Sequence, residues 1–168
     1  MPVEVYFDGL CEPINPGGIA TYGYVIYVNG VKIYEGCGCA GAGIFGDDVT
    51  NNVAEYIALI KSLEWLIENG YTDTEVRVYG DSQLVIMQIN GRYSVRSPRI
   101  VPLFNKVNRL LSRFKSISLT WIPRDENKEA DNLSKKAYYA FLKKYWRKVT
   151  QHYPPYLLKK SKERLKRQ

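Results

Sequence analysis

Asn29-Gly30 is the sequence feature that most restricts the fold of this chain. It lies between two β-rich segments, 22–28 and 31–41. Asn-Gly is the strongest short signal for a two-residue hairpin turn, because both residues tolerate positive φ. A further strand is predicted over 3–8, where side chains of different character alternate. The first part of the chain therefore predicts an antiparallel meander of three strands.

From residue 50 onward, the pattern changes to helices that alternate with single strands. Thr50 or Asn51 is expected to cap a helix whose apolar residues recur at helical spacing and which ends before Gly70. Further helices are expected at 83–90, at 100–114 and from about 126, and strands at 75–79 and 118–122. Trp121, in the last strand, is expected to pack in the core. Because helical crossovers join parallel strands, the predicted α/β fold is a mixed five-stranded sheet, with three antiparallel strands plus two parallel ones, flanked by helices.

Length and composition fit an intracellular globular protein. A chain of 168 residues with 45% hydrophobic residues is not of the disordered class, and it is long enough for one sizeable core. No apolar run approaches the roughly 20 residues that span a bilayer. The start of the chain shows no signal-peptide pattern, and three cysteines do not suggest a secreted disulfide framework. We expect a cytoplasmic monomer that does not associate with membranes.

The net charge of +7 is concentrated near the C-terminus. Residues 143–168 contain ten lysines and arginines against one glutamate. We therefore expect a domain over residues 1–148 and a basic C-terminal tail over 149–168, which is either a short helix or disordered. A terminal basic segment commonly contacts nucleic acid phosphates. The alternative is a solvated segment that only aids solubility.

Four acidic residues, Asp8, Glu55, Asp81 and Asp131, stand in contexts that are unusual for surface carboxylates. The first and third end or follow predicted strands, and the other two lie near the starts of predicted helices. Taken singly, each has a simpler interpretation: Asp8 as a turn residue, Asp81 as a helix cap and Glu55 as a partner of the helix dipole. Asp131 has the interpretation of a solvated helix residue that pairs with Lys135 at i+4. Together they predict one cluster, because active sites of open α/β sheets lie outside the carboxyl ends of strands. Such a cluster favours Mg²⁺, which prefers oxygen ligands and relieves the mutual repulsion.

Over roughly residues 2–140 the chain resembles a type 1 ribonuclease H. Four short motifs carry the resemblance: Asp8-Gly9 with Asn15-Pro16-Gly17-Gly18, Thr50-Asn51-Asn52 ahead of Glu55, Asp81-Ser82-Gln83, and Asn127-Lys128-Glu129-Ala130-Asp131. The resemblance implies that the four acids are catalytic and hold two Mg²⁺ ions per site, with Mn²⁺ as a substitute. It also implies endonucleolytic hydrolysis of the RNA strand of an RNA–DNA hybrid, leaving 5′-phosphate and 3′-hydroxyl ends.

The same resemblance implies a set of substrate-binding residues. Asn15, Asn52 and Gln83 match family positions that hydrogen-bond the RNA strand, whose 2′-hydroxyl groups distinguish it from DNA. Thr50 and Asn51 match positions near the DNA strand, and Thr50 is expected at a phosphate. Helix capping is an alternative interpretation of Thr50 and Asn51, and a plain turn is an alternative interpretation of Asn15.

The chain departs from the family pattern in two places. Many members carry a histidine in the loop before the last helix, whereas this loop contains Arg124. Arg124 is a catalytic candidate that would act electrostatically on the phosphate, since a guanidinium group does not relay protons. Segment 88–99 lacks the basic insertion with which larger relatives grip the DNA strand, so Arg92, Arg96, Arg99 and the basic tail are candidates for that role. Two alternatives stay open: a nuclease that also cuts double-stranded RNA, and a non-catalytic module that binds RNA or hybrids.

Overall fold

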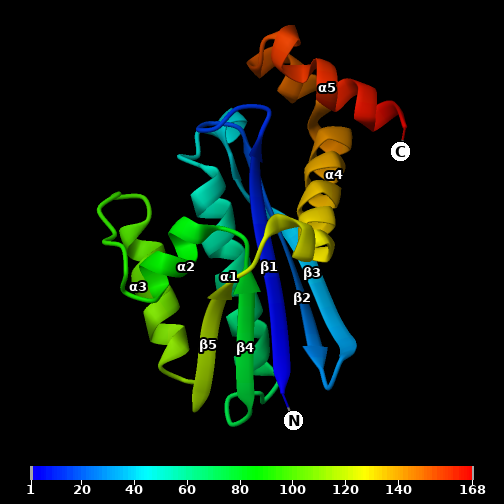
Figure 1. Cartoon of the computed structure of the whole chain (residues 1–168). Coiled ribbons are helices and arrows are strands. Elements are labelled where there is room, and N and C mark those ends of the chain that lie inside the picture. Colours follow the sequence, from blue (N-terminus) through cyan, green and yellow to red (C-terminus); the bar gives the residue numbers. More distant parts are fainter. Residues whose placement is uncertain (1, 168) are drawn as a thin grey trace.

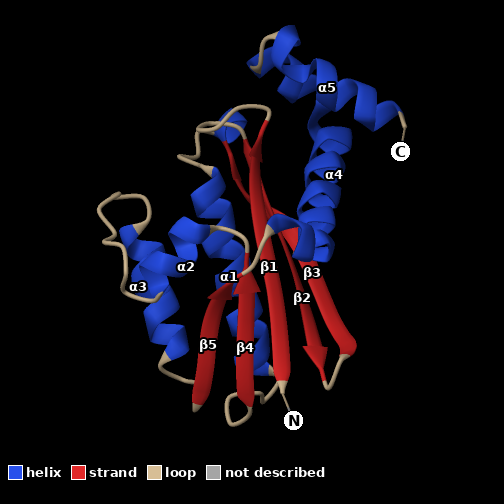
Figure 2. Ribbon diagram, viewed as in Figure 1, coloured by secondary structure: helices blue, strands red, loops and turns tan. Residues whose placement is uncertain are grey.

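The computed structural model describes residues 2–167 and contains a central five-stranded sheet with helices on both faces (Figures 1 and 2). The strands are β1 (Val3–Glu12), β2 (Ile19–Val28), β3 (Val31–Ala42), β4 (Glu75–Gly80) and β5 (Ser116–Trp121). Their order in the sheet is β3-β2-β1-β4-β5. β2 pairs antiparallel with β1 and β3, whereas β4 pairs parallel with β1 and β5. The predicted mixed sheet is confirmed.

Helices cover the two faces of the sheet unequally. They are α1 (Asn51–Glu68), α2 (Gln83–Ile89), α3 (Val101–Leu111), α4 (Lys128–His152) and α5 (Pro155–Lys166), with short 3-10 turns at Gly43–Phe45 and Arg124–Glu126. In Figure 1, α1 lies behind the sheet and α4 lies in front of it. The larger core lies between α1 and the sheet and includes Phe7 and Leu59, and a second core under α4 includes Ile19 and Tyr138. Within residues 2–167, no helix combines the length and apolar character needed to cross a membrane.

The turn between β2 and β3 has the geometry that its sequence predicts. Asn29 and Gly30 both have positive φ, 51° and 75°. This is the primed hairpin conformation, whose twist matches that of antiparallel strands. β1 extends beyond its predicted end at residue 8, because its backbone pairing with β2 continues to Glu12.

The ends of α1 are also as the sequence predicts. The Thr50 side chain caps the helix by accepting a hydrogen bond from the Val53 backbone N–H at 3.1 Å. After the helix, Gly70 has φ +82°, the left-handed conformation that glycine adopts just past a helix C-terminus. The fixed N-terminus determines where the first two turns of α1 present Glu55.

The C-terminal segment is helical and docked on the domain. The boundary predicted between residues 148 and 149 falls inside α4, and α5 crosses the far end of that helix (Figure 1). Val149, Tyr153 and Leu158 are buried in the second core. Basic residues separate these apolar residues in the sequence, so the segment shows a high charge and no clear apolar pattern. Residues 149–167 are therefore an integral extension of the fold.

Two side-chain hydrogen bonds fasten this extension. The Tyr138 hydroxyl and Ser161 Oγ are 2.8 Å apart, and both residues are buried. The Tyr153 hydroxyl donates to the Gly17 carbonyl oxygen at 2.8 Å. The Gly17 N–H in turn donates to the Val49 carbonyl at 3.0 Å. The C-terminal extension thus contacts the loop between β1 and β2.

Candidate active site

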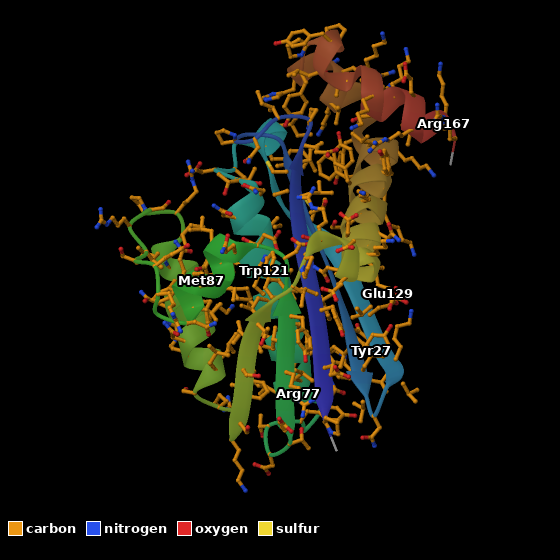
Figure 3. The ribbon with its side chains drawn as sticks, in the orientation of Figure 1. Tyr27, Arg77, Met87, Trp121, Glu129 and Arg167 are labelled. Carbon is orange, nitrogen blue, oxygen red and sulfur yellow. The ribbon has the colours of Figure 1, made fainter. Side chains whose placement is uncertain are left out.

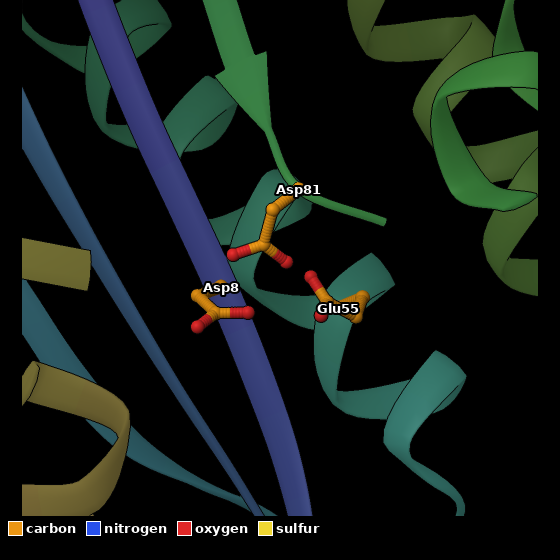
Figure 4. Close-up of side chains that lie close together, drawn as sticks. All are labelled: Asp8, Glu55 and Asp81. Carbon is orange, nitrogen blue, oxygen red and sulfur yellow. The ribbon is translucent and has the colours of Figure 1, made fainter. Parts of the chain in front are cut away.

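Asp8, Glu55 and Asp81 come from distant parts of the chain and meet at one point of the fold (Figure 4). One carboxylate oxygen from each lies within 4.8 Å of the others. Asp8 and Glu55 are buried, with 6% and 5% of their surface exposed, and Asp81 is half-buried. Two oxygen ligands at roughly 2.1–2.5 Å from one cation are at most about 4–5 Å apart. The spacing therefore fits a shared divalent ion.

Parallel pairing of β1 with β4 brings the two aspartates together. Phe7 of β1 pairs with Gly80 of β4, and Asp8 and Asp81 are the residues that follow this pair. The site lies at the end of β4, beside the middle of the longer β1. Ligand sites of open α/β sheets occupy this carboxyl-end position.

Gly9 allows Glu55 to reach the same point. A Cβ atom at Gly9 would lie 2.5 Å from the Ala54 carbonyl carbon and 2.5 Å from the Glu55 backbone nitrogen. Only glycine therefore permits β1 to pass so close to the start of α1. The Gly9 N–H also donates to Asp8 Oδ1 at 2.9 Å, which helps to orient that carboxylate.

Asp131 lies beside the other three carboxylates and outside their 4.8 Å group. It is in the first turn of α4 and forms an ion pair with Lys135 at 2.8 Å. Its charge nevertheless contributes to raising the pKa values of Asp8 and Asp81. The structure thus brings three of the predicted acids into direct proximity. The fourth, Asp131, lies near them and is paired with Lys135.

The three clustered carboxylates are electrostatically unfavourable as anions. Burial, together with the charge of Asp81, raises the pKa of Asp8 to about 7. Burial and the neighbouring Asp8 raise the pKa of Glu55 well above its usual range. Burial also raises the pKa of Asp81, although the hydrogen bond from Asn127 and the charge of Arg124 oppose this rise.

One carboxylate oxygen of the cluster favours the binding of a cation. Glu55 Oε2 is buried and, among the described residues, has no hydrogen-bond partner. An unsatisfied buried carboxylate oxygen is costly, and a divalent cation would satisfy it while relieving the repulsion among the acids. Asp8, Glu55 and Asp81 therefore fit a hard metal ion such as Mg²⁺ or Mn²⁺.

Two residues to which sequence analysis gave no role in the site hold Asp81 in position. Asn127 is 1% exposed, and its Nδ2 donates to the Phe7 carbonyl at 2.9 Å and to Asp81 Oδ2 at 3.2 Å. The indole N–H of Trp121 donates to the Asp81 backbone carbonyl at 3.1 Å. Figure 3 labels Trp121 near the end of β5. The prediction of a core position for Trp121 is wrong: its side chain is 43% exposed, because it ends an edge strand. The position of Asn127 in the motif that ends at Asp131 was a sequence signal for its role.

Arg124 lies in the 3-10 turn that precedes α4, and it is exposed. Its charge acts on Asp81, whose pKa it lowers against the stronger effect of burial. The side chain is therefore close enough to the cluster to act electrostatically on Asp81.

The predicted substrate-binding residues surround the N-termini of α1 and α2. Asn15 and Asn51 form a reciprocal pair, in which Asn15 Nδ2 donates to Asn51 Oδ1 at 2.8 Å and the Asn51 N–H donates to Asn15 Oδ1 at 3.1 Å. Thr50 is buried as the helix cap, and Asn52 is half-buried beside it. Gln83 is exposed at the first position of α2. Thr50 thus acts as the helix cap, and the Asn15–Asn51 pair joins the β1–β2 loop to the start of α1.

Comparison with known proteins agrees with this architecture. The family described as "Reverse transcriptase-like" matches residues 15–137. Ribonuclease HI of Halobacterium salinarum is 36% identical over 138 residues, which cover 80% of this chain and 63% of that relative. The chain therefore spans less than two thirds of that relative's length.

Solved structures extend the comparison. The crystal structure of RNase H1 from Halobacterium salinarum superimposes with a TM-score of 0.72 at 36% identity, covering 82% of this chain and 97% of the other. LC11-RNase H1 in complex with an RNA/DNA hybrid gives a TM-score of 0.72 at 35% identity, covering 80% and 95% of the two chains. The chain therefore belongs to the reverse transcriptase-like family, and its fold is that of a type 1 ribonuclease H domain.

Proposed function

We propose that this chain is a metal-dependent endonuclease that hydrolyses the RNA strand of RNA–DNA hybrids. The observation that carries the proposal is the meeting of Asp8, Glu55 and Asp81 within 4.8 Å, with an unsatisfied buried oxygen on Glu55. A similar domain, LC11-RNase H1, has been solved with an RNA/DNA hybrid, which supports this substrate class. A protein that only bound nucleic acid would gain nothing from such buried repulsion.

In this proposal, Asp8, Glu55 and Asp81 hold the divalent ions, and Asp131 completes the ligand set for two of them. When bound, such ions activate a water molecule and stabilise the leaving oxygen of a phosphodiester, which leaves 5′-phosphate and 3′-hydroxyl ends. Asp131 would bind such an ion by giving up part of its 2.8 Å contact with Lys135. Asn127 keeps the Asp81 carboxylate aimed at the cluster through its 3.2 Å hydrogen bond.

Arg124 is proposed to assist electrostatically. It is exposed and its charge already reaches Asp81, so it is positioned to attract the negatively charged phosphate. It cannot relay a proton near neutral pH, because guanidinium does not deprotonate there.

The groups around the N-terminus of α1 are proposed to hold the two strands. Asn15, Asn52 and Gln83 would contact the RNA strand, where 2′-hydroxyl groups are donors and acceptors. Thr50 and Asn51 would contact the DNA strand. Thr50 Oγ1 accepts from the Val53 N–H, which leaves its hydroxyl hydrogen to donate to a phosphate. Capping and phosphate contact are thus compatible in one side chain.

A cleavage assay with matched duplexes tests the proposal. With Mg²⁺, the wild-type chain should cut the RNA strand of an RNA–DNA hybrid, and Asp8→Asn should abolish this cleavage while hybrid binding persists. Asp73→Asn, a change at an exposed carboxylate, is the matched control and should cleave normally. Comparable cleavage of double-stranded RNA would favour the broader-specificity alternative. Binding without cleavage by the wild-type chain would favour the non-catalytic one.

A further inference from the structure

A basic pocket of about 540 Å³ lies between α4 and α5. Its lining residues are Asn132, Lys135, Lys136, Tyr139, Arg164 and Arg167. Four of these carry positive charge, and none of these lining side chains is acidic. The pocket, called here the α4–α5 basic pocket, is separate from the carboxylate cluster. Two of its cations, Arg164 and Arg167, belong to the basic tail that the sequence made a candidate for contact with the DNA strand, and the other lining residues come from α4. Figure 3 labels Arg167, which lies at the end of α5.

The cations of α5 are held in place by the docking of that helix. Leu158 and Ser161 are buried against the domain, with 4% and 6% of their surface exposed. Arg164 is half-buried and lines the pocket together with Tyr139 of α4, whose hydroxyl raises the pKa of the Arg164 guanidinium. A segment that served only solubility would need neither the buried hydrogen bond to Ser161 nor this contact. The backbone of α5 is therefore fixed and Arg164 is held beside α4, which reduces the entropy lost when this side chain binds a ligand.

Basic residues of α5 divide into two rows on either side of its buried face. At 100° per residue, Arg164 and Arg167 fall on one side of the line through Leu158 and Ser161. Lys159 and Lys162 fall on the other side, where they line a different pocket with Trp146. Lysines of α4 are among the lining residues of the first pocket and not among those of the second.

Lys135 connects this pocket to the candidate active site. It lines the α4–α5 basic pocket and also forms the 2.8 Å ion pair with Asp131. Tyr139 lies two turns beyond Asp131 on α4, which is about 12 Å at a rise of 1.5 Å per residue. One strand of a duplex presents a phosphate about every 3.4 Å along its axis, so for a duplex whose axis runs along α4 the pocket is roughly three to four phosphates from the cluster.

From this arrangement we infer that the α4–α5 basic pocket binds a backbone phosphate of the same nucleic acid whose scissile phosphate lies at the carboxylate cluster. The inference rests on the proposed function and extends it to a second contact point. Arginine side chains bind phosphate through paired hydrogen bonds, and lysines add point charges. Asn132 and Tyr139 supply neutral donors. Contacts of this kind fix the register of a duplex without reading its sequence.

Paired variants with equal loss of charge test the inference. Arg164→Gln with Arg167→Gln removes two cations of the pocket, whereas Lys159→Gln with Lys162→Gln removes two from the opposite row. Each pair is made in an Asp8→Asn background so that an RNA–DNA hybrid is bound without being cut. Affinity is measured between 50 and 200 mM salt, and circular dichroism checks that each variant is folded. Arg164→Lys with Arg167→Lys should restore part of the affinity.

The pocket variant should bind the hybrid about tenfold more weakly at low salt, and the slope of log K against log salt should fall in magnitude by about 1–2. The opposite-row variant should keep nearly the wild-type slope. A neutral methylphosphonate linkage is then moved along each strand. It should weaken binding by the parent protein when it lies three to four phosphates from the scissile one, and this effect should vanish in the pocket variant.

Equal behaviour of the two variants, or a methylphosphonate effect that does not depend on position, would overturn the inference. Its failure can be separated from failure of the proposed function. If the wild-type chain does not cut hybrids, the proposed function is rejected, yet a localised phosphate effect still supports binding at the pocket. If cutting occurs and the two variants bind alike, the pocket inference alone is rejected.

Discussion

Asp8→Asn should stabilise the metal-free protein while destroying its proposed activity. In the folded state burial raises the pKa of Asp8 from 3.8 to about 7. The folded protein therefore retains a proton that the unfolded chain has already lost between these two values. The contribution of Asp8 to the free energy of unfolding is therefore complete below pH 4, and it is lost as the pH rises through 7. Asparagine at the same position carries no charge and avoids this loss.

The magnitude follows from the difference between the two pKa values. At about 1.4 kcal/mol for each pKa unit, a difference of about three corresponds to roughly 4 kcal/mol at pH 8. Asp8 also raises the pKa of Glu55, so the unfavourable free energy is shared between the two carboxylates and cannot be assigned to Asp8 alone. The variant should thus exceed the wild type in free energy of unfolding by about 2–4 kcal/mol at pH 8, and by little at pH 4. For a chain of this size, that is a rise of roughly 5–15 °C in Tm.

Urea denaturation with a chelator present, at pH 4, 6 and 8, measures this difference. Asp73→Asn is the matched control, because it removes an exposed carboxylate and should change stability little at any of these values. Adding Mg²⁺ at a hundred times its dissociation constant should then stabilise the wild type by about 2.7 kcal/mol. The same addition should not stabilise Asp8→Asn. A variant no more stable than the wild type at pH 8, or a difference that does not change with pH, would refute the electrostatic account of the cluster.

Three further changes test how the site is positioned. Gly9→Ala should destabilise the fold by roughly 1–3 kcal/mol and reduce cleavage, because the new Cβ would lie 2.5 Å from the backbone of α1. Thermal unfolding and turnover measure these two effects, and normal values of both would contradict the close approach. Asn127→Ala should move the acidic limb of the pH–rate profile to higher pH, since its hydrogen bond lowers the pKa of Asp81; an unmoved profile would limit Asn127 to a structural role. Thr50→Val should cost about 1 kcal/mol of stability by removing the cap of α1, and Thr50→Ser should restore it in urea denaturation.

Much of the fold was predictable because local signals and tertiary structure agree. Asn29-Gly30 adopts the hairpin conformation that its side chains favour, and Thr50 caps the helix that its hydroxyl predicts. Strand ends were less predictable. β1 continues to Glu12 because a partner strand pairs with it, and such pairing leaves no local signal in the sequence.

The site was predictable in its residues and less so in its geometry. Motif order identified Asp8, Glu55 and Asp81 as acids that meet, and the structure places one carboxylate oxygen of each within 4.8 Å of the others. The i,i+4 spacing of Asp131 and Lys135 indicated their ion pair as the alternative to a role of Asp131 in the site. It did not indicate that Asp131 would lie beside the other acids and yet outside their 4.8 Å group, since that depends on the rotation of α4. Sequence patterns also gave no account of the hydrogen bonds that Trp121 and Asn127 make to Asp81, because these cross between separate elements.

The hydrogen bond from the Tyr153 hydroxyl to the Gly17 carbonyl has a consequence for the design of shortened proteins. Deleting residues 149–168 would remove positive charge, and it would also release one support of the loop that bears Asn15. Loss of activity after such a deletion would therefore have two causes that cannot be separated afterwards. Tyr153→Phe removes the hydroxyl alone and keeps the ring and every basic side chain. Comparing that variant with the charge substitutions separates support of the loop from attraction of the phosphates.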